Sequence, residues 1–265
     1  MTLGRGCWRG AAVSAMKGDR NLSVASRAFA ILDMLRGRTA IALSDVVAEM
    51  GLPSATAHRY LSELTEIGVL ERQDSGRYRL GLRIWQLGVA SDWDRQVRST
   101  AAPFLDAFAR ETGHAVALAL LQGDRVICFD RRLGRSDDII LASAGDDVPL
   151  MRTSVGKVLL AGASRANVAA LVQRDGEPYP FRLRALAQID QARVSGYVVA
   201  DGEARPGQRS MSVPVGADPQ TGGQFGLTVL TPIHYENIER YLPSLALFAR
   251  KLGAALKLPH HPLTV

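Results

Sequence analysis

The chain has 265 residues, of which 47% are hydrophobic, and its formal net charge is +6. This composition predicts a folded protein of one or two domains, and no apolar run approaches the roughly 18 residues that a membrane span needs. The positive charge favours polyanionic partners and is concentrated at the start, because residues 1–90 carry 12 Lys/Arg and 8 Asp/Glu, whereas residues 91–265 carry 20 and 18.

Residues 1–21 are predicted to be a disordered arm. They include basic and small side chains but lack the apolar core of roughly 7–15 residues that a signal peptide needs. Cys7 and Cys128 are the only cysteines and stand far apart, which excludes a disulfide framework and a zinc site. We therefore expect a cytoplasmic protein without a metal site or another cofactor.

Residues 22–81 predict a winged helix-turn-helix domain. Apolar residues at helical spacing indicate one helix over residues 23–36 and a short one over residues 44–50, which Ser44 can cap. A third helix follows in LPSATAHRYLSELTEIG, and VLERQDSGRYRLG indicates a hairpin. Helix, helix, turn, helix and hairpin in this order are typical of a winged helix-turn-helix. The apolar face of the third helix consists of Ala57, Tyr60, Leu61, Leu64 and Ile67.

The opposite face of the third helix is thin and polar at its start, as a recognition helix in the major groove requires. Its hydroxyl, imidazole and guanidinium groups can bind base edges or phosphates. In the hairpin, two arginines alternate around a tyrosine, a pattern suited to a wing that lies on the DNA backbone. A winged helix used for protein contacts is the alternative interpretation. The predicted DNA contacts are Ser54, Thr56, His58, Arg59, Arg77, Tyr78 and Arg79.

Residues 82–97 predict one linker or dimer-packing helix, and residues 98–260 predict a domain of interleaved helices and strands around a mixed sheet. Residues 138–145 are a candidate strand of this sheet. The last long helix, over residues 235–257, must kink or restart at Pro243. Residues 261–265 form a tail. The fold class is therefore α/β, or α+β, with a second domain that differs in character from the first.

Polar residues in the second domain are compatible with a small-molecule site. Thr153 and Ser154 stand at a predicted helix start, where backbone N–H groups favour a carboxylate. Arg209, Ser210 and Thr228 fall on predicted strands, so a polar-edged cavity can form beside that helix. Ordinary helix capping and surface strands explain the same residues equally well. No G-x-S-x-G or H-E-x-x-H motif occurs, so the sequence predicts no enzyme.

From about Leu22 onward the chain resembles the IclR family of bacterial transcription regulators. The resemblance rests on SRAFAILDML, LSDVVAEMGLPSATAHRYLSELTEIGVLERQDSGRYRLG, TSVGKVLLA and SGYVVADGEARPGQRSMSVPV. It implies a winged helix-turn-helix, a linker helix and a GAF-like effector-binding domain. It also implies homodimers or dimers of dimers that bind operator DNA under the control of a small carboxylate or aromatic metabolite. A dimer would place two recognition helices roughly 34 Å apart on a palindromic operator.

The resemblance also relates individual residues to the family's DNA-binding motif. The family's recognition helix typically reads Pro-Lys-Ser-Thr-x-His-Arg, which Pro53, Thr56 and the His58-Arg59 pair match. Ser54 and Ala55 depart from that motif, so the operator sequence is expected to differ accordingly.

The family's effector-binding positions fall on both strands and helices of the second domain. They correspond here to Ile140, Val148, Ser154, Val155, Ala200, Gln208, Ser210, Thr228 and Leu230. Some members carry Asp, Cys and Ser where this chain has Ala200, Ser210 and Leu230, which makes this site less acidic and partly more apolar. We expect an effector with one carboxylate or polar head facing Ser154 and an apolar body, rather than a two-carbon oxoacid. The alternative is a constitutive DNA-binding protein whose C-terminal domain only oligomerises.

Overall fold

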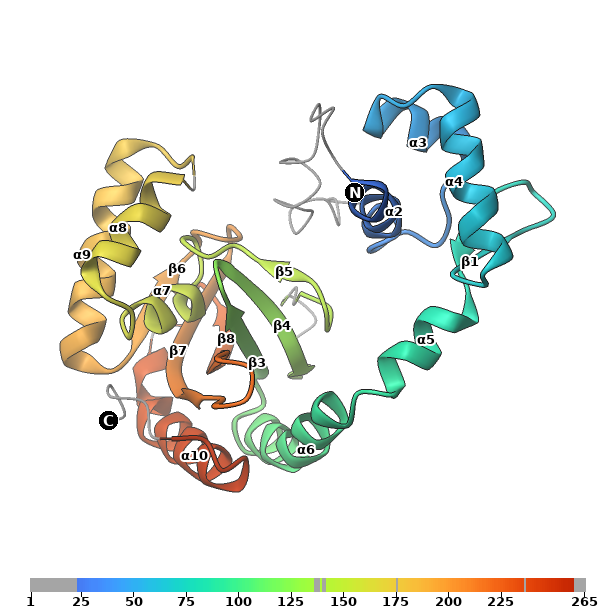
Figure 1. The fold of residues 1–265 in the computed structure, drawn as a ribbon. Coiled ribbons are helices and arrows are strands. Elements are labelled where there is room, and N and C mark those ends of the chain that lie inside the picture. The colour runs from blue at the N-terminus through green and yellow to red at the C-terminus, as the bar shows by residue number, and fades with distance from the viewer. Residues whose placement is uncertain (1–22, 136–138, 140–141, 175, 236, 260–265) are drawn as a thin grey trace. The chain divides into compact units, whose positions relative to one another are not determined.

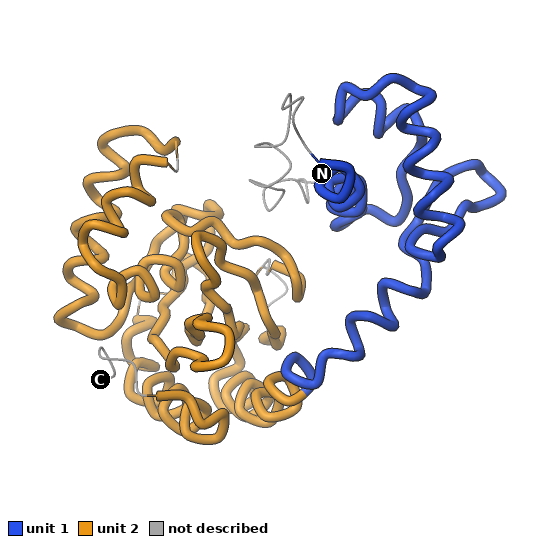
Figure 2. The backbone as a smooth tube through the Cα atoms, viewed as in Figure 1, with its two compact units in different colours: residues 1–95 blue, residues 96–265 orange. Residues whose placement is uncertain are grey.

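The computed structural model describes residues 23–135, 139, 142–174, 176–235 and 237–259. The predicted arm over residues 1–21 and the predicted tail over residues 261–265 lie outside the described residues. The chain divides into two compact units, residues 1–95 and residues 96–265 (Figure 2). No helix among the described residues is long and apolar enough to cross a membrane.

The first unit packs helices α2, α3 and α4 against a two-stranded hairpin (Figure 1). In chain order its elements are α2 (Val24–Asp33), α3 (Leu43–Met50), α4 (Ser54–Glu66), β1 (Leu70–Arg72) and β2 (Tyr78–Leu80). The hairpin strands are antiparallel, and Ile41 pairs with Tyr78 in an isolated bridge. This is the predicted order of elements in a helix-turn-helix domain with a wing.

The core of the first unit comes from one face of each helix, as the sequence pattern requires. Ile31, Val46 and Leu61 are fully buried in one cluster with Leu70 and Tyr78 from the hairpin. The buried part of the apolar face of α4 is one turn shorter than the sequence predicts. Ala57, Tyr60, Leu61 and Leu64 are buried, whereas Ile67 is 50% exposed beyond the helix end.

The predicted cap of the second helix is wrong by two residues. Helix α3 begins at Leu43, and its N-cap is Ala42 rather than Ser44. The Asp45 carboxylate accepts the backbone N–H of Ala42 at 2.7 Å. The side chain that caps the start of this helix is therefore Asp45, in the first turn, and not the predicted Ser44.

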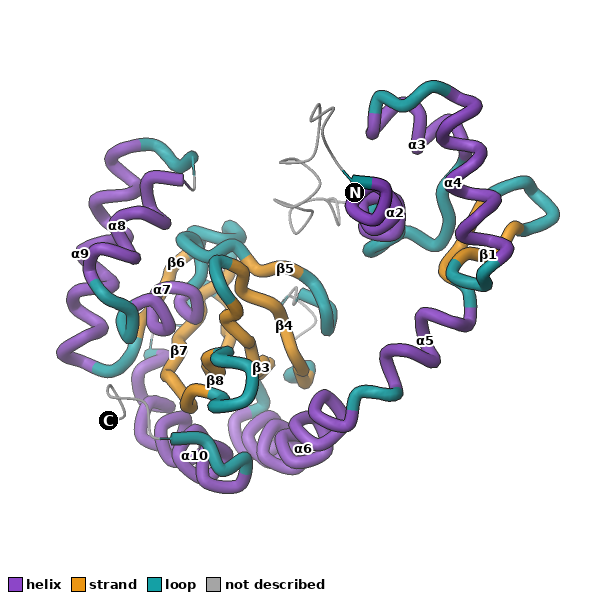
Figure 3. Tube along the Cα trace, in the orientation of Figure 1, coloured by secondary structure: helices purple, strands orange, loops and turns teal. Residues whose placement is uncertain are grey.

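The predicted single linker helix over residues 82–97 is also wrong. Two helices occupy this region, α5 (Leu82–Val89) and α6 (Asp92–Thr112), and Figure 3 shows a short loop between them. The Ser91 hydroxyl accepts the backbone N–H of Asp94 at 3.4 Å, and α6 has Asp92 and Asp94 in its first turn. A serine followed by acidic residues starts a new helix, which then continues well beyond residue 98.

The second unit is built on a six-stranded sheet in the order β5-β4-β3-β8-β7-β6. Its strands are β3 (Ala115–Gln122), β4 (Arg125–Arg132), β5 (Asp147–Val148), β6 (Val198–Asp201), β7 (Gln208–Ala217) and β8 (Gln224–Pro232). Every described pairing is antiparallel, so the expected mixed sheet is wrong. Short turns join β3 to β4 and β7 to β8, and such turns permit only antiparallel neighbours.

The candidate strand over residues 138–145 lies partly outside the described residues. Its described end, residues 142–145, forms no strand, and β5 lies just after it.

Helices cover both faces of the sheet. Helices α7 (Ser154–Leu160), α8 (Arg165–Arg174) and α9 (Tyr179–Ser195) lie on one side, and α6 and α10 (Leu242–Ala255) lie on the other (Figure 1). Pro243 stands in the first turn of α10, after the 3-10 helix η1 (Ile238–Tyr241), so the predicted restart is confirmed. The likeness of this unit to a GAF domain stays a prediction.

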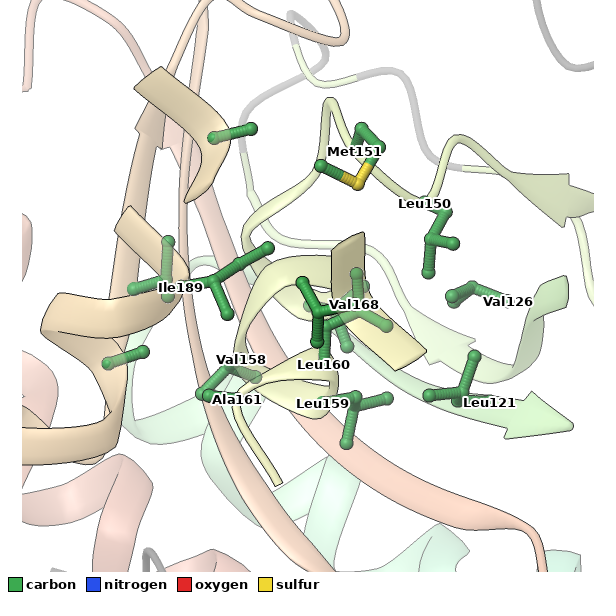
Figure 4. Packing of buried hydrophobic residues seen from close by; sticks show 14 of the residues in the cluster. Leu121, Val126, Leu150, Met151, Val158, Leu159, Leu160, Ala161, Val168 and Ile189 are labelled. Atoms are coloured by element: carbon green, nitrogen blue, oxygen red, sulfur yellow. The ribbon is translucent and has the colours of Figure 1, made fainter. Parts of the chain in front are cut away.

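Helix α7 is the centre of the second unit, and all seven of its residues are buried. Figure 4 shows Val158 and Leu159 among side chains from the sheet, such as Leu121, and from α9, such as Ile189. The helix approaches the sheet closely at Gly226, where an added Cβ would lie 2.7 Å from the Val155 Cγ2. This close packing holds the start of α7 against strands β7 and β8.

Candidate functional site

The outer face of α4 carries the helix side chains that the sequence predicts to contact DNA. Ser54, His58 and Arg59 are exposed, and Thr56 is half-buried. Burial of the opposite face fixes this orientation. The Arg59 side chain is 68% exposed and lies 3.7 Å from the Glu63 carboxylate. Since an exposed pair of this kind contributes little, Arg59 can turn towards a ligand at small cost.

The two arginines predicted for the wing are exposed but already engaged. Arg79 donates two hydrogen bonds to the Glu71 carboxylate, at 3.1 and 2.7 Å, and these bonds raise the pKa of the Arg79 guanidinium. Arg77 donates to the Ala40 carbonyl at 3.0 Å and lies 3.7 Å from the Asp45 carboxylate. Both guanidinium groups therefore already have partners within the first unit.

Tyr78 is not available to DNA, and its inclusion among the predicted contacts is wrong. Its side chain is only 4% exposed and belongs to the core cluster of the first unit. Successive residues of a strand point to opposite faces. In β2 the exposed Arg79 therefore implies an inward neighbour, which is Tyr78.

Four hydroxyl groups form a continuous hydrogen-bonded row between α7 and the sheet. The Ser154 hydroxyl donates to Ser210 at 2.8 Å and lies 2.7 Å from the Ser212 hydroxyl. The Ser212 hydroxyl in turn lies 2.8 Å from that of Thr228. Ser154 and Ser212 have no exposed surface, whereas Ser210 is half-buried. The structure thus brings together three of the predicted effector residues, with Ser210 nearest to solvent.

Three predicted effector positions fall in one row across the strands. Ala200 pairs with Ser210, and Ser210 pairs with Leu230. Side chains directly opposite one another share a face of the sheet, so the hydroxyl of Ser210 lies between two apolar side chains. Gln208, at the start of the same strand, is half-buried opposite Pro232.

The remaining predicted effector positions are placed differently. Val155 is buried in the core cluster around α7. Val148 is on β5, at the other edge of the sheet from β6, and packs against that cluster. Ile140 lies outside the described residues. Thr153 accepts the Gly156 N–H at 3.2 Å and donates to the Pro149 carbonyl at 2.8 Å, so for this residue the capping interpretation applies.

A buried ion pair adjoins the hydroxyl row and was not expected from the sequence. Lys157 has no exposed surface, and its ammonium group donates to the Gln188 side chain at 2.6 Å and to the Glu203 carboxylate. Burial lowers the pKa of Lys157, and the bond to Glu203 opposes that shift. Because Glu203 follows β6 and Gln188 is on α9, the pair fastens both segments to α7.

Lys157, Gln188, Glu203 and Ser212 were not predicted from the sequence, but Lys157 and Ser212 each left a signal in it. Lys157 is the single charge in the apolar run SVGKVLLA, where a buried lysine needs a partner. Ser212 stands two residues from Ser210 on one strand, so both had to share a face.

Comparisons with known proteins identify two domains in the chain, a DNA-binding domain and a C-terminal regulator domain. The model of the IclR helix-turn-helix domain matches residues 24–74, and the model of the bacterial transcriptional regulator IclR C-terminal domain matches residues 93–240. The chain is 30% identical over 205 residues to the glycerol operon regulatory protein of Streptomyces coelicolor, covering 74% of this chain and 80% of the relative. It is 29% identical over 199 residues to the HTH-type transcriptional regulator XynR of Escherichia coli, covering 71% and 78%.

A solved structure is similar over nearly its whole length. It is an IclR homolog from Microbacterium hydrocarbonoxydans complexed with 4-hydroxybenzoate, with a TM-score of 0.77 and 25% identity, and the match covers 89% of this chain and 99% of that one. The relatives are transcriptional regulators, in agreement with the prediction that the chain is not an enzyme. With a C-terminal match that spans more than half of its length, the chain belongs to the IclR family of bacterial transcriptional regulators, with a DNA-binding and a ligand-binding domain.

Proposed function

We propose that this regulator binds a palindromic operator as a homodimer, or a dimer of dimers, under the control of a small organic acid or aromatic metabolite in the cytoplasm. The exposed polar face of α4 supports the DNA contact, with Ser54, Thr56, His58 and Arg59 towards the major groove. The metabolite can change the affinity for DNA only by the difference in its own affinity for the two states of the protein.

Helix α5 supports the homodimer. None of its residues is buried, and it leaves Leu82 66%, Trp85 63% and Leu87 63% exposed. A second copy of the same helix is the simplest cover for this apolar surface. Two copies joined in this way would present two α4 helices to one DNA duplex, which requires a palindromic operator.

The direction of the hydroxyl row carries the proposal for the effector. Each hydroxyl has one proton to donate, and Ser154 gives its own to Ser210. Ser212 must therefore donate to Ser154, and Thr228 to Ser212. The hydroxyl proton of Ser210 is then the one that has no acceptor within the row. In a chain of hydrogen bonds each bond polarises the next, so the last hydroxyl becomes a stronger donor. Ser210, supported by Ser154, is thus the group that offers a hydrogen bond to an effector.

This arrangement favours an acceptor oxygen attached to an apolar body. A carboxylate oxygen can accept from Ser210, while Ala200 and Leu230 on either side offer apolar contacts. The 4-hydroxybenzoate bound by the Microbacterium homolog belongs to this chemical class. A two-carbon oxoacid would leave the apolar side chains without a partner.

The test is a thermal-shift screen of the full-length protein against aromatic and aliphatic monoacids, followed by calorimetry of each hit. A ligand that binds the native state raises the melting temperature by mass action. A hydrogen bond to a charged group contributes about 1.5–3 kcal/mol, so Ser210→Ala is expected to weaken binding about tenfold or more. Ser99→Ala, which removes an exposed hydroxyl on α6, is the matched control.

Two results would contradict the effector proposal. One is tighter binding of glyoxylate than of aromatic acids, and the other is an unchanged affinity in Ser210→Ala. If no acid in the panel shifts the melting temperature while the protein binds DNA, the constitutive DNA-binding protein replaces the ligand-controlled one.

A further inference from the structure

The wing has three arginines near its strands, and their environments differ. In the hairpin register, Arg72 stands opposite Tyr78, and Glu71 stands opposite Arg79. Opposed residues share a face, so Arg79 meets a carboxylate across the strands, whereas Arg72 meets an aromatic ring. This difference in cross-strand partner decides which cation keeps its charge available to a polyanion.

Arg79 and Arg77 are neutralised within the protein. The Arg79–Glu71 pair is bidentate and occupies the N–H edge that the guanidinium would otherwise offer to a phosphate. Arg77 is turned towards the start of α3 by the Ala40 carbonyl and the Asp45 carboxylate. To bind DNA, either arginine would first have to leave its own partner.

Arg72 has no such partner among the residues that the structure describes. Its guanidinium carbon lies 5.9 Å from the centre of the Tyr78 ring, and one of its terminal nitrogens would be 3.9 Å from a Cβ added at Gly76. The side chain therefore rests on a buried ring and reaches the turn at the tip of the hairpin. Asp74 belongs to that turn, but no ion pair joins it to Arg72 in the described part of the chain. A cation held over a ring keeps its N–H edge free for an anion.

We propose that Arg72, and not Arg77 or Arg79, is the residue of the wing that binds a DNA phosphate. The inference rests on the proposed DNA binding and assigns one contact within it. Tyr78 then acts indirectly, because its buried ring supports the guanidinium of Arg72 at the tip of the hairpin.

The experiment measures the salt dependence of binding, which counts phosphate contacts. Full-length protein is titrated onto a fluorescein-labelled DNA duplex of mixed sequence, between about 50 and 200 mM KCl, and affinity is followed by anisotropy. Each phosphate contact contributes about 0.9 to the slope of log affinity against log salt. Arg72→Ala is expected to lower the slope by about 0.9 for each wing in the complex, and Arg72→Lys to keep it.

The matched variants change Glu71 and Arg79, the neighbouring cross-strand pair of the same hairpin. Arg79→Ala is expected to keep the wild-type slope, because its charge is already neutralised by Glu71. Glu71→Gln is expected to make the slope steeper, since it frees Arg79 for a phosphate. All variants alter exposed side chains, and thermal melting checks that each is folded.

The assignment of Arg72 is overturned if Arg72→Ala keeps the wild-type slope, or if Arg79→Ala lowers the slope as much as Arg72→Ala does. An unchanged slope in Glu71→Gln also contradicts it, because Glu71 would then not restrain Arg79. If the wild-type protein binds no duplex at any of these salt concentrations, the proposed DNA binding itself fails, which is a distinct result.

Discussion

The two units use polar side chains in opposite environments. On α4 of the first unit, His58 and Arg59 face solvent and are held only weakly by their neighbours. On α7 of the second unit, Ser154 and Lys157 have no exposed surface, and each is held by partners from other segments. A surface that binds a large polyanion needs exposed, adjustable charges, whereas a site for a small molecule needs groups held in fixed positions.

The ion pairs offer the largest expected contrast between the units. Lys157→Met removes one partner of a buried pair and leaves Glu203, whose side chain is 12% exposed, with an uncompensated carboxylate. We expect a loss of about 3–5 kcal/mol in the free energy of unfolding, measured by urea denaturation of the second unit. Arg79→Ala breaks the exposed pair of the first unit and should leave the urea midpoint unchanged, because solvent screens that pair.

A second substitution tests whether the lost stability reflects the unpaired carboxylate. Adding Glu203→Gln to Lys157→Met removes the remaining charge and is expected to restore part of the loss. If Lys157→Met is as stable as the wild type, the ion pair does not fasten α9 and the segment after β6 to α7.

Two glycines in helices give the next largest contrast. A Cβ added at Gly156 in α7 would lie 2.0 Å from the Leu150 carbonyl oxygen, so Gly156→Ala forces the backbone apart. We expect a destabilisation of about 1–3 kcal/mol. At Gly88 in α5 an added Cβ meets nothing within 4 Å. Gly88→Ala should therefore stabilise the chain by about 0.5–1 kcal/mol through helix propensity.

Thermal and urea unfolding of the two alanine variants measure this contrast. Equal effects in α7 and α5 would mean that α7 does not pack as tightly against the preceding loop as the Leu150 contact indicates.

The smallest expected effect is a pH dependence of stability in the second unit. The His114 Nε2 lies 3.1 Å from the Tyr241 hydroxyl, and its ring contacts Tyr235 and Tyr241 edge-on. Burial, and then the positive charge of Arg240, lower the pKa of His114 below its ordinary value of 6.5. The unfolded chain therefore binds a proton that the folded chain resists, so stability falls as the pH drops below that value.

Melting temperatures between about pH 7.5 and about pH 5.5 measure this effect. We expect the wild type to lose stability towards acid and His114→Asn to lose less of it, since asparagine does not titrate in this range. An equally steep decline in the variant would assign the acid sensitivity to other groups.

Local patterns predicted the elements of both units well. Apolar spacing placed α4 and most of its buried face, and the predicted strands that carry Arg209, Ser210 and Thr228 correspond to β7 and β8. The errors lie where local patterns compete. The apolar residues of 82–97 suited one helix, yet Ser91 starts a new one. Tyr78 looked like part of an exposed wing, yet strand alternation turns it inward.

The sequence by itself determined the helix-turn-helix layout and the membership of the family, because periodicity and motifs are properties of neighbouring residues. Tertiary structure alone decided that Ser154, Ser210, Ser212 and Thr228 form one continuous row, that Lys157 meets Glu203, and that Glu71 pairs with Arg79 but not with Arg72. These facts depend on which distant segments pack together and in which register. Hydrogen bonds and ion pairs act over a few ångströms, so which groups meet is set by the packing of the folded chain rather than by their spacing along it.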